Sequence, residues 1–270
     1  MIRIDGQVLD IGNFPDGSIL VKYDPTNGNG VNFRRKFITW RYETDREFLC
    51  LIYLVKHLRA HGVEDIYLNM PYIPNARQDR VKSLEDVFTL KYFAEVLNSL
   101  NLAEVSVLDP HSSVSEALIN NIRVTTPEKY IIRVLNKITF YDKGSAPLMF
   151  YPDEGSIKRY SGMVTLPYAF GIKKRNWETG KIEGLDVAGS VDQIAGKDIL
   201  IVDDICSRGG TFYHSAKKLK ELGAKDIYLY VSHCENTILE GELLKGDLIK
   251  KVYTTDSIFT KSHEKIEVLK

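Results

Sequence analysis

A short apolar segment passes into two acids, a basic residue and a glycine pair: Ile199-Leu200-Ile201-Val202-Asp203-Asp204-Ile205-Cys206-Ser207-Arg208-Gly209-Gly210-Thr211. Its apolar part is bounded and rich in β-branched residues, which is typical of a parallel strand covered on both faces. Two glycines at the start of the next helix let backbone N–H groups approach a phosphate, and the helix dipole favours an anion. The acid pair can bind ribose hydroxyls or the water of a metal ion. The segment therefore predicts a site for a phosphorylated sugar, with an ordinary strand, turn and helix as the alternative.

A second informative segment follows the predicted strand Asp65 to Met70: Pro71-Tyr72-Ile73-Pro74-Asn75-Ala76-Arg77-Gln78-Asp79-Arg80. Its two prolines indicate an ordered loop at the carboxyl end of that strand, where open α/β sheets bind ligands. The guanidinium groups of Arg77 and Arg80 can bind phosphates through paired N–H donors. A charged loop that only faces solvent is the alternative.

Strands and helices are expected to alternate along the chain, which predicts the α/β class with mainly parallel sheets flanked by helices. We expect strands at 104–108, 148–151 and 227–231, and helices at 48–58 and 211–222. Thr44 and Glu47 have the spacing of a capping box before the first helix. Ser83 and Asp86 are expected to open another helix, with a buried apolar stripe from Leu84 to Leu100. A boundary near 125–129 predicts two domains, 1–127 and 128–270.

The composition favours an enzyme of the cytoplasm. Lys plus Arg equals Asp plus Glu at 36 each, so no overall charge attracts nucleic acid. No apolar run approaches the length of a membrane span, and we expect no signal peptide. The three cysteines, Cys50, Cys206 and Cys234, are unclustered and odd in number, which favours a reducing compartment over a disulfide framework.

The two segments resemble the sugar-phosphate loop and the ATP-binding loop of ribose-phosphate pyrophosphokinases. Type I phosphoribosyltransferases share the first loop and lack the second. Shorter matches follow in the family's order: Phe14-Pro15-Asp16-Gly17-Ser18, Asp109-Pro110-His111, Pro152-Asp153-Glu154-Gly155, Lys173-Lys174-Arg175-Asn176 and Ser232-His233. Each is weak alone, but together they extend the resemblance from about Gly12 to Ile258.

The resemblance implies two phosphoribosyltransferase-like domains and a Mg²⁺-dependent transfer of pyrophosphate from ATP to ribose 5-phosphate. It implies ATP contacts from the first domain: Arg77, Gln78, Asp79 and Arg80, with Phe14 and Asp16 reading the adenine across a subunit interface of a homo-oligomer. It implies sugar-phosphate contacts from the second domain: Asp203, Asp204, Ser207, Arg208, Gly209, Gly210 and Thr211. His111 and Asp153 would contact the metal, and Lys174, Arg175 and His111 would be catalytic. No nucleic-acid or membrane partner is implied.

The chain departs from the family's pattern at informative positions. Ser207 and Arg208 replace an acid and a threonine of the sugar loop, and Asn176 replaces an arginine. The segments before Phe14 and after Ile258 are shorter than in the family, which indicates a compact divergent member. If Arg208 points inward, it would suit the second phosphate of an ADP-ribose acceptor; if it faces solvent, ribose 5-phosphate remains the acceptor. A phosphoribosyltransferase and a catalytically silent regulatory homologue are the remaining alternatives.

Overall fold

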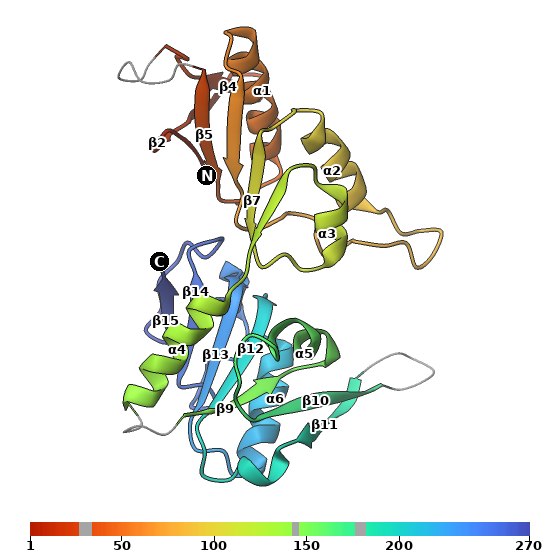
Figure 1. Ribbon diagram of the computed structural model, residues 1–270, viewed down its shortest axis with the longest axis vertical. Coiled ribbons are helices and arrows are strands. Elements are labelled where there is room, and N and C mark those ends of the chain that lie inside the picture. Colours follow the sequence, from red (N-terminus) through yellow and green to blue (C-terminus); the bar gives the residue numbers. More distant parts are fainter. Residues whose placement is uncertain (27–33, 142–145, 176–181) are drawn as a thin grey trace. The chain divides into compact units, whose positions relative to one another are not determined.

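The computed structural model describes residues 1–26, 34–141, 146–175 and 182–270, and the chain divides into two compact units, Met1–Thr126 and Pro127–Lys270 (Figure 1). Each unit has its own sheet and its own hydrophobic core. The mixed α/β class predicted from the sequence is confirmed.

The first unit contains a six-stranded sheet. Its order is β2 (Gln7–Val8), β1 (Ile2–Ile4), β5 (Arg35–Trp40), β6 (Asp65–Asn69), β7 (Glu104–Leu108) and β8 (Ile122–Thr125). Strands β5 to β8 are parallel, whereas β1 and β2 are antiparallel additions. A separate hairpin is formed by β3 (Asp10–Asn13) and β4 (Ile19–Lys22). The helices are α1 (Arg46–Ala60), α2 (Thr89–Asn98) and α3 (Ser113–Leu118).

Helix α1 forms because its apolar residues recur at helical spacing. Cys50, Leu51, Leu54 and Leu58 are fully buried in the same core as strand residue Ile66. The predicted capping box at Thr44 and Glu47 is wrong, because Asp45 is the N-cap and makes no side-chain cap bond.

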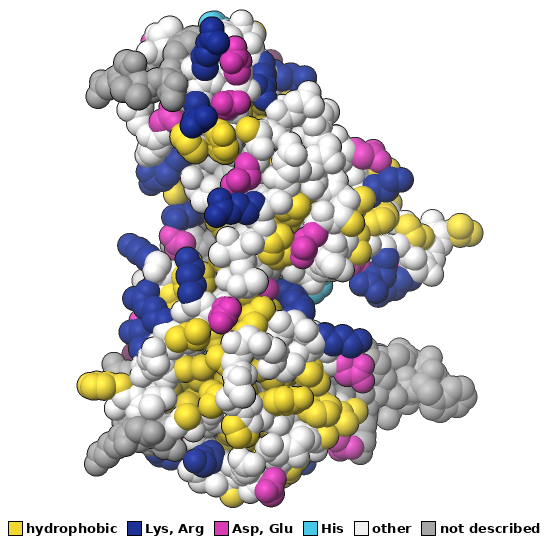
Figure 2. Space-filling view, in the orientation of Figure 1, with side chains coloured by type: hydrophobic (Ala, Val, Ile, Leu, Met, Phe, Trp, Pro, Cys, Tyr) yellow, Lys and Arg dark blue, Asp and Glu magenta, His cyan; other side chains and the backbone are white. Residues whose placement is uncertain are grey.

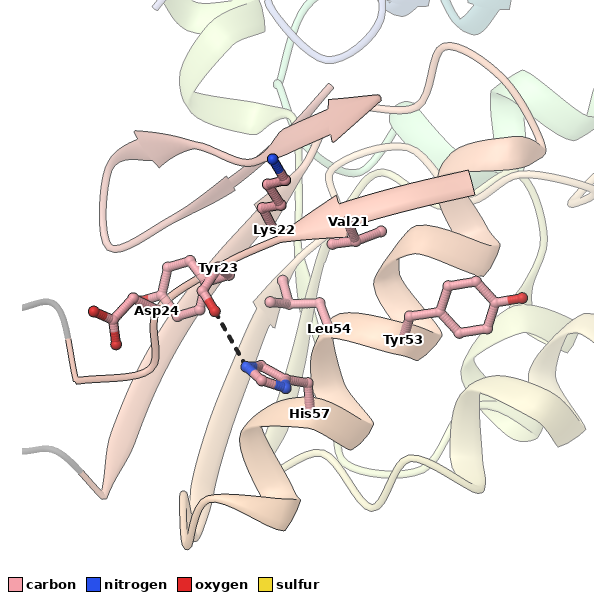
Figure 3. Close-up of a pocket in the computed structure, with 7 residues that line it drawn as sticks. All are labelled: Val21, Lys22, Tyr23, Asp24, Tyr53, Leu54 and His57. Carbon is pink, nitrogen blue, oxygen red and sulfur yellow. Dashed lines mark hydrogen bonds between the residues drawn. The ribbon is translucent and has the colours of Figure 1, made fainter. Parts of the chain in front are cut away.

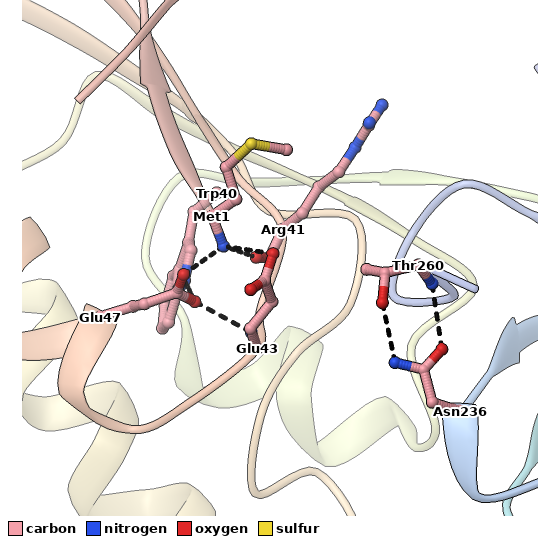
Figure 4. A network of polar contacts seen from close by, with 7 residues as sticks. All are labelled: Met1, Trp40, Arg41, Glu43, Glu47, Asn236 and Thr260. Carbon is pink, nitrogen blue, oxygen red and sulfur yellow. Dashed lines mark hydrogen bonds and ion pairs between the residues drawn. The ribbon is translucent and has the colours of Figure 1, made fainter. Parts of the chain in front are cut away.

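The carboxylate of Glu47 has other partners (Figure 4). It accepts a hydrogen bond from Trp40 Nε1 at 3.0 Å and one from the backbone N–H of Glu43 at 2.9 Å, and it pairs with the amino group of Met1. These bonds tie the end of β5 and the amino terminus, next to β1, to the start of α1.

The predicted start of the next helix at Ser83 is also wrong, because α2 begins at Thr89, although Leu90, Phe93 and Leu97 of the predicted stripe are buried. The carboxylate of Asp86 accepts the backbone N–H groups of Lys82 and Ser83, at 2.9 and 2.8 Å, and so closes a turn. Leu84 and Val87 are exposed rather than buried. The segment before α2 is the gold loop at the side of the first unit in Figure 1, and Figure 2 shows hydrophobic and basic side chains on it.

The second unit contains a seven-stranded sheet. Its order is β11 (Ile182–Gly189), β10 (Tyr168–Arg175), β9 (Leu148–Tyr151), β12 (Ile199–Cys206), β13 (Ile227–Cys234), β14 (Lys251–Thr255) and β15 (Ile266–Leu269). All neighbours are parallel except β10 and β11. The helical segments are α4 (Glu128–Tyr141), α5 (Glu154–Tyr160), α6 (Gly210–Glu221), η1 (Val191–Gln193) and η2 (Asn236–Glu240).

Two hydrophobic clusters cover this sheet. One contains Ile131 and Ile138 of α4 together with Tyr160 of α5, and the other contains Phe212 and Leu219 of α6. Strand β12 contributes alternate residues to the two clusters, as a strand buried on both faces must. The sheet is therefore a central layer between helices, as the apolar run at 199–202 predicts.

Candidate functional site

The strand order of the second unit reverses between β9 and β12. After β9 the chain passes through α5 to β10 on one side, and after β12 it passes through α6 to β13 on the other side. Such a switch point leaves a crevice beyond the carboxyl ends of the two strands, where open α/β sheets bind ligands. Asp153 directly follows β9, and the acid pair 203–204 lies near the end of β12. The topology therefore brings the sequence-predicted acids to one edge of this sheet.

The glycine turn that opens α6 is held by a neighbouring segment. Gly209 has a φ of 77° and is the N-cap of α6, with no side-chain cap bond. A Cβ atom at Gly209 would lie 2.9 Å from Cδ2 of Leu243, and one at Gly241 would overlap the carbonyl oxygen of Arg208. A Cβ at Gly210 meets no heavy atom within 4 Å. The start of α6 thus keeps backbone N–H groups without a side-chain cap on an exposed surface that suits an anion.

The two acids of β12 have different environments. A carboxylate oxygen of Asp204 lies 3.0 Å from Nη1 of Arg159, and the Asp204 side chain is only 5% exposed. Asp203 accepts the backbone N–H of Asp204 at 3.0 Å. The pKa of the Asp203 carboxyl is raised well above its ordinary value. Burial is the largest cause, and the charges of Asp204 and Asp153 add to it. Asp204 is thus paired with a cation, whereas burial and the neighbouring carboxylates favour the protonated form of Asp203.

Asp153 is the N-cap of α5 as well as a predicted metal contact. Its Oδ1 atom accepts the backbone N–H groups of Gly155 and Ser156, at 3.1 and 3.2 Å. The Ser156 hydroxyl in turn accepts the backbone N–H of Asp153, which completes a capping box. The acid is therefore fixed in position by the helix that it starts.

Arg208 does not point into the glycine turn. Its guanidinium group pairs with a carboxylate oxygen of Glu240 at 3.2 Å, and its side chain is 74% exposed. Glu240 ends η2, and Asn236 at the start of η2 exchanges two hydrogen bonds with Thr260, at 2.8 and 3.1 Å (Figure 4). Of the two orientations considered from the sequence, the structure shows the solvent-facing one.

The predicted ATP loop of the first unit contains both buried and exposed side chains. Ala76 and Asp79 are buried, whereas Arg77, Gln78 and Arg80 are exposed. The buried residues hold the loop while the exposed ones present two guanidinium groups and an amide. This arrangement fits a phosphate-binding loop.

Asp79 joins this loop to the next strand's loop. It accepts two hydrogen bonds from Arg80, at 2.7 and 2.9 Å. These two bonds are the main reason that the pKa of the Asp79 carboxyl is lowered. A hydrogen bond from Ser112 and the neighbouring charge of His111 lower it further. Because β6 and β7 are adjacent parallel strands, the loops after them meet at one edge of the sheet. Asp79 therefore lies between Arg80 and the loop that carries His111, two residues predicted from separate motifs.

Two further sets of predicted residues lie at the ends of antiparallel strand pairs. Phe14 and Asp16 lie in the turn of the β3–β4 hairpin, where Asp16 accepts the backbone N–H of Ser18 at 2.9 Å and half of the Phe14 surface is exposed. Lys174 and Arg175 end β10, opposite β11, but their side chains lie outside the described part of the chain, as does Asn176 altogether.

Within the described residues, no group of three or more His, Cys, Asp or Glu side chains could hold a metal ion. Mg²⁺ commonly binds one or two carboxylates together with substrate phosphates. Burial, and then the charges of Asp204 and Asp153, raise the pKa of Asp203, and such a group of acids fits a cation that arrives with substrate phosphates.

A cavity of about 490 Å³ in the first unit lies away from these motifs (Figure 3). It is lined by Val21, Lys22, Tyr23, Asp24, Tyr53, Leu54 and His57. His57 Nε2 lies 3.1 Å from the carbonyl oxygen of Tyr23, a bond that closes one side of the cavity. No residue predicted from the sequence lines it.

Sequence reasoning missed Arg159 and Glu240. Arg159 lies six positions after Asp153, on the helix that Asp153 begins, and that spacing could have indicated it. No pattern in the sequence indicated Glu240, because its partner Arg208 is 32 positions earlier in the chain.

Named sequence relatives cover most of the chain. The ribose-phosphate pyrophosphokinase of Thermococcus kodakarensis is 30% identical over 227 residues, which cover 83% of this chain and 77% of that protein. The ribose-phosphate pyrophosphokinase of Caldanaerobacter subterraneus subsp. tengcongensis is 27% identical over 273 residues, covering 97% and 81%. No family model matches the chain.

The structure is also similar to a solved one. The crystal structure of phosphoribosylpyrophosphate synthetase from Mycobacterium smegmatis matches 97% of this chain and 85% of that chain, with a TM-score of 0.77 and 19% identity. This likeness confirms the predicted fold of two phosphoribosyltransferase-like domains. None of the helices in the described parts of the chain has the length and apolar character needed to cross a membrane.

Proposed function

The chain belongs to the ribose-phosphate pyrophosphokinase family, and from this membership we propose that it transfers the pyrophosphoryl group of ATP to the 1-hydroxyl of ribose 5-phosphate. The products would be phosphoribosyl pyrophosphate and AMP. The observation that carries the proposal is the relative that is 30% identical over most of both chains. The switch-point crevice supports it, because a glycine turn and two acids lie there together.

The sugar phosphate would bind the second unit. Its 5-phosphate would meet the backbone N–H groups of Gly210 and Thr211 and the hydroxyl of Ser207, at the uncapped start of α6. Asp203 and Asp204 would accept hydrogen bonds from the sugar 2- and 3-hydroxyls. Both acids lie at the carboxyl end of β12, the strand that leads into this turn.

ATP would bind the exposed side chains of the first unit's loop: Arg77, Gln78 and Arg80. Asp79 would act by holding Arg80 in place. Phe14 and Asp16, in an exposed hairpin turn, would contact the adenine held by a neighbouring subunit of a homo-oligomer.

In the reaction, the 1-oxygen of the sugar attacks the β-phosphorus of ATP, the bond between that phosphorus and the α,β-bridging oxygen breaks, and AMP leaves. Catalysis consists of positioning and charge stabilisation, as in phosphoryl transfer generally. Lys174 and Arg175 would supply cations to the transferring group. His111 and Asp153 would contact a Mg²⁺ ion bound with the phosphates, and that ion supplies positive charge at the reacting oxygens.

The orientation of Arg208 supports ribose 5-phosphate over ADP-ribose as the acceptor. Paired with Glu240 at the surface, Arg208 leaves the turn open to a terminal phosphate. Arg208→Thr should leave ribose 5-phosphate turnover within about twofold, because an exposed ion pair contributes only about 0–1 kcal/mol. A large loss of ribose 5-phosphate turnover in this variant would contradict the solvent-facing role.

The remaining alternatives have less support. A phosphoribosyltransferase has no use for the Ala76–Arg80 loop, which the structure builds with buried anchors and exposed arginines. A silent homologue has no use for an acid pair with a matched arginine. We propose the cytoplasm as the location, since all three cysteines are free and buried.

The decisive experiment measures AMP release from ATP and Mg²⁺ with ribose 5-phosphate, with ADP-ribose and with no acceptor. The proposal expects AMP and phosphoribosyl pyrophosphate in equal amounts with ribose 5-phosphate. AMP release only with ADP-ribose would support the alternative acceptor, and no release with either sugar would contradict both.

A further inference from the structure

We propose that Arg159 is a positioning residue for the sugar, because it fixes the orientation of the Asp204 carboxylate at the crevice. This inference rests on the proposed function and adds to it a residue that the sequence motifs do not contain. The short ion pair between Nη1 of Arg159 and Oδ2 of Asp204 carries it.

The pair lies within the second unit and is mostly buried. The Asp204 side chain is 5% exposed and the Arg159 side chain 25% exposed, at a separation of 3.0 Å. An ion pair at this separation restricts both side chains, and partial burial reduces its screening by salt. An acid in this position cannot rotate freely, so its second oxygen has a defined direction.

The helix that carries Arg159 is itself anchored at the same crevice. Helix α5 contacts β9, β10 and β12, and its capping box fixes Asp153 at its start. The adjacent Tyr160 is fully buried, and the guanidinium carbon of Arg159 lies 5.1 Å from the centre of that ring. One short helix therefore holds an acid at its first turn and a cation at its last, and both face the acid pair of β12.

Because of this ion pair, the carboxylates of Asp203 and Asp204 have different partners. Asp204 is held by a protein cation, whereas Asp203 accepts a backbone N–H from within its own strand. A sugar with two neighbouring hydroxyls needs two acceptors at a fixed spacing. Arg159 provides that spacing by holding one acceptor still, and it does so without contacting the sugar itself.

The test compares three variants of the full chain. Arg159→Gln removes the cation, Arg159→Lys keeps a cation without the planar fork, and Lys158→Met removes the exposed charge of the preceding residue as a control. The steady-state KM and kcat are measured for ribose 5-phosphate, and the dissociation constant is measured for ATP by calorimetry. Thermal melting shows whether each variant is folded.

We expect Arg159→Gln to raise the sugar KM at least tenfold and to leave ATP binding within twofold, because ATP binds a loop of the other unit. Arg159→Lys should recover part of the sugar KM, and Lys158→Met should match the parent chain. A general loss of structure would weaken the binding of both substrates. A raised sugar KM with unchanged ATP binding therefore distinguishes a positioning role from a folding defect.

Two results would overturn the inference: an Arg159→Gln variant with an unchanged sugar KM, or equal losses for sugar and ATP in a folded variant. If Arg159→Gln fails to fold, Arg159→Lys decides, since a sugar KM equal to that of the parent excludes a need for the guanidinium geometry. A parent chain that releases no AMP contradicts the proposed function instead, which keeps the two failures distinct.

Discussion

Two adjacent glycines at the start of α6 should respond in opposite ways to the same substitution. Gly209 has a φ of 77°, and its Cβ would lie 2.9 Å from Cδ2 and 3.0 Å from Cβ of Leu243. Gly210 begins the helix, and a Cβ there meets no heavy atom within 4 Å. Alanine at either position adds the same single methyl group, so the contrast depends only on the backbone and the surroundings.

The expected magnitudes come from these two differences. Left-handed backbone costs an L residue about 1–2 kcal/mol. Crowding a packed neighbour such as Leu243 adds about 1–3 kcal/mol. Gly209→Ala should therefore destabilise the second unit by about 2–5 kcal/mol. Gly210→Ala should be neutral or stabilise it by up to about 1 kcal/mol, because alanine restricts the unfolded chain at a compatible site.

The assay is urea denaturation of the full chain, with hydrogen exchange of the α6 and β12 peptides to assign the change to the second unit. Leu243→Ala, made alone and with Gly209→Ala, completes a double-mutant cycle. Its coupling should be favourable by about 1–2 kcal/mol, since the smaller side chain removes the contact with Cδ2 but keeps the contact with Cβ and the backbone strain.

Enzyme kinetics give a second reading of the same glycine pair. If backbone N–H groups at the start of α6 bind the 5-phosphate, the methyl group of Gly210→Ala lies on the phosphate side and should raise the sugar KM while stability is kept. Equal destabilisation by the two alanines would refute the structural reasoning. A sugar KM that is unchanged by both Gly209→Ala and Gly210→Ala would refute the proposed position of the 5-phosphate.

Three other predictions concern charged residues. Asp203→Asn combined with Asp204→Asn should abolish turnover while ATP binding by calorimetry survives, and loss of ATP binding in a folded variant would contradict the division between the units. Lys174→Ala should lower kcat at least a hundredfold, about 3 kcal/mol, with little change in KM; a change in KM alone would assign Lys174 to ground-state binding. Asp79→Asn should destabilise the first unit by about 1 kcal/mol at neutral pH, because one partner of its ion pair is exposed. Since folding lowers the pKa of Asp79, that difference should shrink as the pH falls below about 4 in parallel melts, and a difference independent of pH would contradict it.

The strands were predictable because their signal is local. The strands expected at 104–108 and 148–151 have those bounds in the structure, and the apolar run from Ile199 forms the central strand β12. A buried parallel strand needs a short run of β-branched residues, and that requirement can be met only in a few places along a chain. The helix expected from Ser83 failed because Asp86 binds two backbone N–H groups and closes a turn, which leaves Leu84 outside the core.

The places of the predicted site motifs in the fold follow for a related reason, since each lies near the end of a strand or soon after it. Asp153 follows β9, the acid pair lies near the end of β12, and the loop that contains Arg77 follows β6. The carboxyl ends of parallel strands lie at one edge of the sheet, so motifs that are distant in the sequence come together there. The orientation of Arg208 could not be predicted, because it depends on Glu240 in a segment that the motifs do not include.

Two acids hold charged side chains of the predicted site in place, one in each unit. Asp79 is part of one motif but bonds Arg80 and neighbours His111, so it couples two loops at the edge of the first sheet. Arg159 belongs to no motif that the sequence indicated, yet it pairs with Asp204 at the edge of the second sheet. In both units, a buried carboxylate is held by an arginine that is partly exposed. Burial of the acid makes its charge depend on that arginine, and the exposed part of the arginine leaves the pair within reach of a ligand. In each unit, an acid paired with an arginine therefore lies beside residues proposed to bind a substrate, and charges held in this way suit the positioning of two anionic substrates.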